Sequence, residues 1–304
     1  MEQDGAQDRR PTDDVRPGTR WLLIAFAVLT ALAVNQLLVF ADVADRFWAW
    51  AIPTELTAAF LGAAYAAGFV LAVVALRQRE WSRIRVPVIT VTAFTWLTAV
   101  ATGIHLHKFH LTSGGPIAQG AARVWLAVYL LIPLACLGVV VAQERRRHGP
   151  DPVLRPMPAG LTAVLAIEGI VMAAAGGVLF AGGVTVHHHA SAAAFWPWPL
   201  MPLGSMVIGA WLIALGLAAA LVIAQRDLSR LFVSGVTYTV FGVLQSVAVI
   251  WHWPQLSRHD VSLWLYLTML AAVVLTGAYG WWAARRPAPQ QDTSGVASAA
   301  TSGT

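Results

Sequence analysis

Long apolar runs separated by short polar connections dominate the chain between residues 21 and 284. Each run is about 20 residues long, which is the length that a helix needs to cross the hydrocarbon core of a bilayer. The pattern therefore predicts an all-α membrane protein with eight transmembrane helices, at Trp21–Ala41, Leu56–Leu76, Val86–His105, Val124–Gln143, Ala159–Phe180, Met201–Ala224, Leu231–Trp251 and Leu263–Ala284. The first run is longer than the roughly 7–15 apolar residues of a cleaved signal peptide, so we expect it to be retained.

The polar segments at the two ends have no apolar face. Residues 1–20 are charged and contain prolines, and residues 285–304 are rich in small and polar residues. Such segments cannot bury enough apolar surface to fold, so both are expected to be disordered tails. Residues 145–158 are a third polar segment, and they form a linker in the middle of the chain.

The second half of the apolar region repeats the first. When the sequence is shifted by 147 positions, Gln78–His105 aligns with Gln225–His252 without a gap, and twelve of the 28 positions are identical. Composition alone would match alanines and leucines, but it would not reproduce the polar connection that both segments contain. We therefore predict two tandem four-helix repeats, residues 21–144 and 159–284. Because four is an even number, the repeats have a parallel orientation in the membrane.

Composition and charge agree with this class. Hydrophobic residues make up 58% of the chain and charged residues only 12%, about half the share that is usual in soluble domains. Nearly all arginines lie in the two tails and in connections that eight spans place on one side of the membrane. The positive-inside rule then puts both termini in the cytoplasm. The net charge of +5 is thus explained by topology, and we expect a lipid bilayer rather than nucleic acid as the partner.

The histidines are the first candidates for chemistry. Neutral imidazole is a common ligand of haem iron and of divalent metals. The repeat matches His105 with His252, so this pair is a candidate site for haem or a metal ion between the repeats. His107 and His110 are further candidate metal ligands, because they would share one face of a continued helix. Alternatively, these side chains cap helix ends at the membrane surface. The three adjacent histidines His187–His189 cannot all face one ion from regular structure.

Glu168 is the second candidate, because it is the only carboxylate well inside a predicted span. A membrane-embedded carboxylate is unfavourable and therefore indicates function. It could carry a proton, bind a cation, or serve as a structural acid that pairs with the polar residues Asn35, Gln36 and Gln245. The chain contains no nucleophile elbow, phosphate-binding loop or dinucleotide fingerprint, and its single cysteine excludes an intrachain disulfide.

The segments TAAFLGAAYAAGFVLAVVALRQREW, GIHLHKFH and FWPWPLMPLGSMVIGAWL resemble a group of uncharacterised integral membrane proteins of high-GC actinobacteria, over most of residues 40–280. This resemblance implies a bacterial inner membrane and brings no activity with it. The architecture is also comparable with that of haem A synthase, although this chain has one matched histidine per half and lacks the ExxHxR motif. Three functions remain open: transport of a small solute or ion or an accessory membrane subunit, haem or metal binding, and a structural or interaction role.

Overall fold

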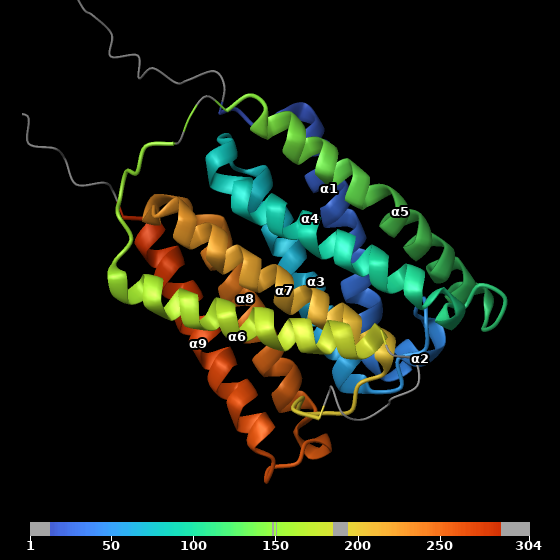
Figure 1. Cartoon of the computed structure of the whole chain (residues 1–304). Helices are drawn as coiled ribbons and strands as arrows, with labels where there is room; N and C mark the ends of the chain where they lie inside the picture. The colour runs from blue at the N-terminus through green and yellow to red at the C-terminus, as the bar shows by residue number, and fades with distance from the viewer. Residues whose placement is uncertain (1–12, 148, 150, 185–193, 287–304) are drawn as a thin grey trace, which may run out of the picture.

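The computed structural model describes residues 13–147, 149, 151–184 and 194–286, and 79% of this part is helical (Figure 1). Eight of the described helices are long and apolar enough to cross a membrane, which confirms the predicted number of spans. They are α1 (Pro17–Val34, continued by a π-helical turn at Asn35–Val39), α3 (Glu55–Leu76), α4 (Trp81–Ile104), α5 (Pro116–Glu144), α6 (Ala159–Val184), α7 (Pro202–Gln225), α8 (Phe232–Trp251) and α9 (Val261–Ala284). Short segments join them, namely α2 (Ala44–Phe47) and the single turns Ala41–Val43, Leu106–Lys108, Leu228–Arg230 and Trp253–Gln255.

Several helices extend beyond the apolar runs that predicted them. α5 begins at Pro116, because a proline is favourable at the first helical position and Gln119 and Arg123 continue the helix. α1 also begins with a proline, Pro17, so residues 17–20 form its first turn instead of belonging to a disordered tail. Hydropathy identifies the membrane-crossing part of a helix, whereas capping residues determine where the helix begins.

The eight spans form a bundle with four inner and four outer helices. α3 and α7 are the most buried spans, and α4 and α8 lie beside them, while α1, α5, α6 and α9 lie on the perimeter (Figure 1). α3 packs against α1 and α8, whereas α7 packs against α6 and α4. α5 covers α4, and α9 covers α8. The inner helices therefore contact partners from both the N-terminal half (residues 13–147) and the C-terminal half (residues 151–286).

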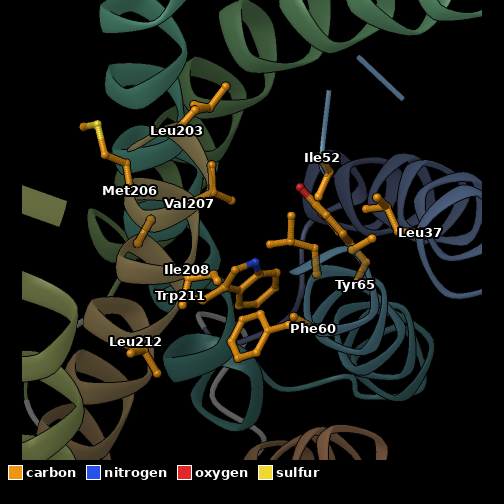
Figure 2. Packing of buried hydrophobic residues seen from close by; sticks show 14 of the residues in the cluster. Leu37, Ile52, Phe60, Tyr65, Leu203, Met206, Val207, Ile208, Trp211 and Leu212 are labelled. Atoms are coloured by element: carbon orange, nitrogen blue, oxygen red, sulfur yellow. The ribbon is translucent and has the colours of Figure 1, made fainter. Parts of the chain in front are cut away.

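Aromatic side chains fill the centre of the bundle. The indole of Trp211 on α7 packs on Phe94 of α4 with ring centroids 4.0 Å apart, and it meets Tyr65 of α3 edge-on at 5.8 Å. Figure 2 shows Trp211 and Ile208 directed toward Phe60 and Tyr65 of α3. Rings of this size bury much apolar surface, so they fix the position of α7 between α3 and α4.

Glycines allow α6 and α7 to approach closely. A Cβ added at Gly176 would lie 2.7 Å from the carbonyl oxygen of Gly209, and one at Gly209 would lie 2.7 Å from that of Gly176. Gly169 and Gly216 make a similar contact two turns along the same pair of helices. Small residues at such positions are the usual means of helix association in membranes, where the hydrophobic effect does not drive helices together.

Each half has a short extended segment before its first helix, and this segment pairs with the connection between the second and third helices. In the N-terminal half, the N–H of Val15 donates to the carbonyl oxygen of Arg79 (2.8 Å), and that of Trp81 donates to the carbonyl oxygen of Asp13 (2.6 Å). In the C-terminal half, the N–H of Met157 donates to the carbonyl oxygen of Arg226 (3.1 Å), and that of Leu228 donates to the carbonyl oxygen of Arg155 (2.9 Å). Residues 13–16 and 155–157, which the sequence assigned to a tail and a linker, therefore belong to the folded structure.

Candidate functional site

Glu168 lies in the interior of the bundle, where three helices of the C-terminal half meet. It is 3% exposed, and its carboxylate accepts hydrogen bonds from Thr276 Oγ1 at 2.8 Å and Tyr238 Oη at 3.1 Å. α6 supplies the carboxylate, and α9 and α8 supply the two hydroxyls. An unpaired carboxylate in an apolar environment is strongly unfavourable, so these two donors are what stabilises Glu168 inside the bundle.

Tyr238 and Thr276 also line a cavity of about 100 Å³ between the two halves. α3 and α4 form one side of the cavity, and α6, α7, α8 and α9 form the other. Its walls are mainly apolar, and they include the aromatic rings of Phe94, Trp211, Tyr238 and Phe241. The cavity has room for a small organic group, and the ring faces attract a cation placed against them.

Positions that the predicted repeat would pair line this cavity together. Six pairs of lining residues are separated by 147 positions in the sequence: Gly68 and Leu215, Leu71 and Ala218, Pro87 and Ser234, Thr90 and Thr237, Val91 and Tyr238, and Phe94 and Phe241. Two pairs differ in polarity, because Ser234 and Tyr238 carry hydroxyls where Pro87 and Val91 have none, and the hydroxyl of Tyr238 donates to Glu168. The site with the carboxylate therefore belongs to one half only, although both halves enclose the cavity.

The amide side chains suggested as partners of Glu168 lie elsewhere. Gln245 of α8 donates from Nε2 to the carbonyl oxygen of Phe60 on α3 at 2.9 Å, and it accepts from Tyr266 Oη at 3.4 Å. Asn35 and Gln36 lie in the π-helical turn and line a second cavity. The hydrogen bonds that Glu168 receives within the described part of the chain thus come from hydroxyls, and the expected amide partners were wrong.

The matched histidines His105 and His252 make different contacts, and each reaches the opposite half. His105 is fully buried, and its Nε2 lies 2.9 Å from the carbonyl oxygen of Gly183 on α6. Since a carbonyl only accepts, Nε2 carries the proton and Nδ1 is unprotonated. His252 donates from Nδ1 to the carbonyl oxygen of Ala248 at 2.9 Å, and its Nε2 lies 3.8 Å from Glu55 Oε2. A shared haem or metal ion would have to replace these two separate sets of contacts.

Burial also changes the chemistry of His105. Removal from water disfavours the charged imidazolium, so burial lowers the pKa of His105 below its ordinary value. The hydrogen bond to Gly183 and the nearby His107 and Lys108 act on the pKa less strongly. The neutral form therefore predominates at neutral pH, in agreement with the tautomer that the Gly183 contact requires.

The remaining histidines are only partly brought together. The rings of His105 and His107 have centroids 6.0 Å apart, whereas His110 Nδ1 lies 3.3 Å from the carbonyl oxygen of Trp48. Within residues 13–147, 149, 151–184 and 194–286, the structure forms no group of three or more histidine, cysteine, aspartate or glutamate side chains that could hold a metal ion. His187–His189 lie outside the described residues.

Sequence reasoning found Glu168 but missed the residues around it. Tyr238, Thr276 and Trp211 give the site its hydroxyls and one of its rings. A signal for Tyr238 was present, because a tyrosine in the middle of a span needs a hydrogen-bond partner and replaces Val91 of the first half. The register between helices, which brings Thr276 to Glu168, leaves no comparable trace in the sequence.

The fold and this site define a multi-pass integral membrane protein with a polar cluster buried beside a cavity between its halves. No protein-family model, curated protein or solved structure matches the chain.

Proposed function

We propose that this protein is a carrier that exchanges a small organic cation for protons across the membrane. The observation that carries the proposal is the aromatic cavity between the halves, whose wall residues Tyr238 and Thr276 are hydrogen-bonded to the buried Glu168. Aromatic walls favour quaternary and alkylated ammonium groups, and a carboxylate supplies the compensating charge. A metal ion or an inorganic anion would find too few polar ligands in the same cavity.

The arrangement of helices supports a duplicated carrier with its site at the interface of the repeats. α3 packs on α8 and α7 packs on α4, so the second helix of each predicted repeat contacts the third helix of the other. The backbone pairing before α1 recurs before α6, and the cavity is lined by six corresponding pairs of positions. Sites between parallel repeats are common in secondary transporters, where one repeat moves against the other.

Competition at Glu168 couples the two solutes. A buried carboxylate is stabilised either by a proton or by a nearby cation, so binding of one weakens binding of the other. Two unit charges about 6 Å apart attract by about 3 kcal/mol at an effective dielectric constant of about 20, which is roughly a hundredfold in affinity. The hydroxyl of Thr90, which is buried without a partner among the described residues, offers the ligand a further oxygen.

The location follows from the arginine distribution and from the resemblance to actinobacterial membrane proteins. We place the protein in the bacterial inner membrane with both termini in the cytoplasm. The backbone pairing before α1 and α6, the cationic connections and the C-terminal end of α9 then lie on the cytoplasmic side. In this orientation, protons that enter the cell from the outside drive the export of the organic cation.

The test uses radiolabelled tetramethylammonium as the probe. Proteoliposomes loaded at pH 6 and diluted into buffer at pH 8 should accumulate it, because outflowing protons drive its uptake. Glu168→Gln should abolish this uptake and lower the affinity for tetramethylammonium about a hundredfold. Trp211→Leu should weaken binding by removing one ring of the cavity.

Glu80→Gln is the matched control, because it makes the same chemical change at a side chain that is 53% exposed and whose ion pair within the described part of the chain is with Arg83, three residues later. Uptake by this variant should equal that of the wild type. If the wild-type protein neither binds nor accumulates tetramethylammonium, the cation proposal is wrong. If Glu168→Gln retains proton-driven uptake, another group couples the two solutes.

A further inference from the structure

A second cavity of about 340 Å³ lies within the N-terminal half, between α1 and α5. Leu32 of α1 and Ile117 and Val124 of α5 border it, and these side chains are 60%, 59% and 55% exposed. Exposed apolar residues on spanning helices face lipid. The cavity therefore opens sideways into the bilayer, where a molecule dissolved in the membrane can enter it.

The inner wall of this cavity is aromatic. Tyr65 of α3 and Tyr129 of α5 share a hydrogen bond of 2.8 Å, and Trp125 stacks on Tyr129 with ring centroids 4.3 Å apart. Flat rings lining a cavity provide stacking surfaces for another flat ring. A flexible acyl chain would gain less from such walls than a planar group.

Unused hydrogen-bond donors lie around the same cavity. Trp48 lines it and is 6% exposed, and its indole N–H has no hydrogen-bond partner in the described part of the chain. A buried donor without a partner is unfavourable by about 1–3 kcal/mol, so it indicates that something else supplies an acceptor. Asn35 and Gln36 add two side-chain amides to the lining of the cavity.

The π-helical turn explains why these amides are near the cavity. α1 widens at Asn35–Val39, and its inner face packs so tightly on α3 that a Cβ at Gly62 would lie 2.7 Å from the backbone nitrogen of Leu38. The wide turn buries Leu37 completely and leaves Asn35 and Gln36 beside the cavity. Such single wide turns are frequently found at functional sites.

We propose that this cavity binds a lipid-soluble molecule with a planar ring, carbonyl acceptors and an apolar tail, of the isoprenoid quinone class. The aromatic wall receives the ring, the N–H groups of Trp48 and the amides donate to the carbonyl oxygens, and the lateral opening accommodates the tail. The proposal concerns binding alone, and it is independent of the cation cavity because no residue lines both cavities.

The test is photolabelling with an azido-substituted decylbenzoquinone in phosphatidylcholine nanodiscs, with the labelled peptides located by mass spectrometry. We expect label in α1 and α5, and competition by unlabelled decylbenzoquinone. Gly120→Leu should reduce specific labelling at least tenfold, because Gly120 lines the cavity and a Cβ added there meets no atom within 4 Å. The new side chain therefore begins without a clash, and its isobutyl group takes up space at the cavity wall.

Gly138→Leu is the matched control, since Gly138 lies on the same helix, is equally unobstructed and does not line the cavity. This variant should label like the wild type. Trp48→Phe keeps an aromatic ring but removes the N–H donor, so it should weaken competition by about three- to tenfold.

Three results would overturn the proposal. Labelling that is unchanged in Gly120→Leu would place the quinone elsewhere. Equal loss in Gly120→Leu and Gly138→Leu would indicate an effect on α5 as a whole. Competition by phosphatidylglycerol as strong as that by the quinone, together with no effect of Trp48→Phe, would identify an acyl chain as the occupant. Glu168→Gln should label normally, which keeps this test separate from that of the cation carrier.

Discussion

The contact between α6 and α7 can be tested with two adjacent glycines. Gly176 faces α7, where an added Cβ would lie 2.7 Å from the carbonyl oxygen of Gly209 and 2.8 Å from the backbone nitrogen of Ile213. Gly177 is its neighbour on the same helix, and an added Cβ there meets no atom within 4 Å. Gly176→Ala and Gly177→Ala therefore make the same chemical change in the same helix with opposite steric consequences.

The expected difference follows from these distances. Replacing glycine by alanine in a helix stabilises it by roughly 0.5–1 kcal/mol, and both variants share this gain. Only Gly176→Ala forces two backbones apart, and overpacking of this kind costs about 1–3 kcal/mol. Because the obstructing atoms belong to the backbone and cannot rotate away, we expect the upper part of that range. Gly176→Ala should thus be less stable than Gly177→Ala by about 2–3 kcal/mol.

Reversible unfolding of the purified protein in mixed micelles, with SDS as the denaturant, would measure the two free energies of unfolding. Near-ultraviolet circular dichroism in the absence of SDS would show whether both variants begin from the native packing. If Gly176→Ala is as stable as Gly177→Ala, the two helices are farther apart than the structure places them. The glycine contact would then not hold α6 against α7.

Three further results are expected. The free energy of unfolding should fall as the pH drops below about 6.5, because burial lowers the pKa of His105 in the folded protein and the unfolded chain takes up the proton more readily. His105→Gln should reduce this pH dependence of the free energy of unfolding in a pH series of SDS titrations. Glu144→Gln should lower the free energy of unfolding by about 1–3 kcal/mol, because Glu144 accepts hydrogen bonds from a tryptophan and two arginines. Glu80→Gln at the exposed ion pair should change the free energy of unfolding by less than about 0.5 kcal/mol. Equal effects of the two substitutions would contradict this reasoning. Tyr238→Phe should destabilise the protein by about 1–3 kcal/mol in the same assay, because Glu168 loses one of its two donors; a neutral result would mean that water or another group replaces it.

The spans could be predicted because the bilayer imposes one length and one polarity on every crossing helix. The prediction failed where local chemistry sets a boundary, as at Pro116, or where tertiary packing distorts a helix, as in the wide turn at Asn35–Val39. Packing of Gly62 against that turn involves residues more than 20 positions apart. No hydropathy pattern encodes such a contact.

The candidate site could be predicted only in part for a related reason. A lone carboxylate in an apolar run is visible in the sequence, so Glu168 was found. Its partners Tyr238 and Thr276 come from two other helices, and which side chains meet there depends on how deeply each helix sits in the bundle. The predicted repeat pairs His105 with His252, but in the structure each imidazole contacts a different group, which the sequence does not indicate.

The inner helices of each half pack against the inner helices of the other half, and this has a consequence for biosynthesis. α3 has α8 as a major neighbour, and α4 has α7, so the N-terminal half lacks two of its packing partners when its last helix leaves the ribosome. Its buried faces, including the face of α3 that carries Phe60, must remain in lipid until residues 202–251 have been inserted. Assembly of the bundle is therefore largely post-insertional, and a nascent chain halted after α5 would be a natural substrate for membrane quality control.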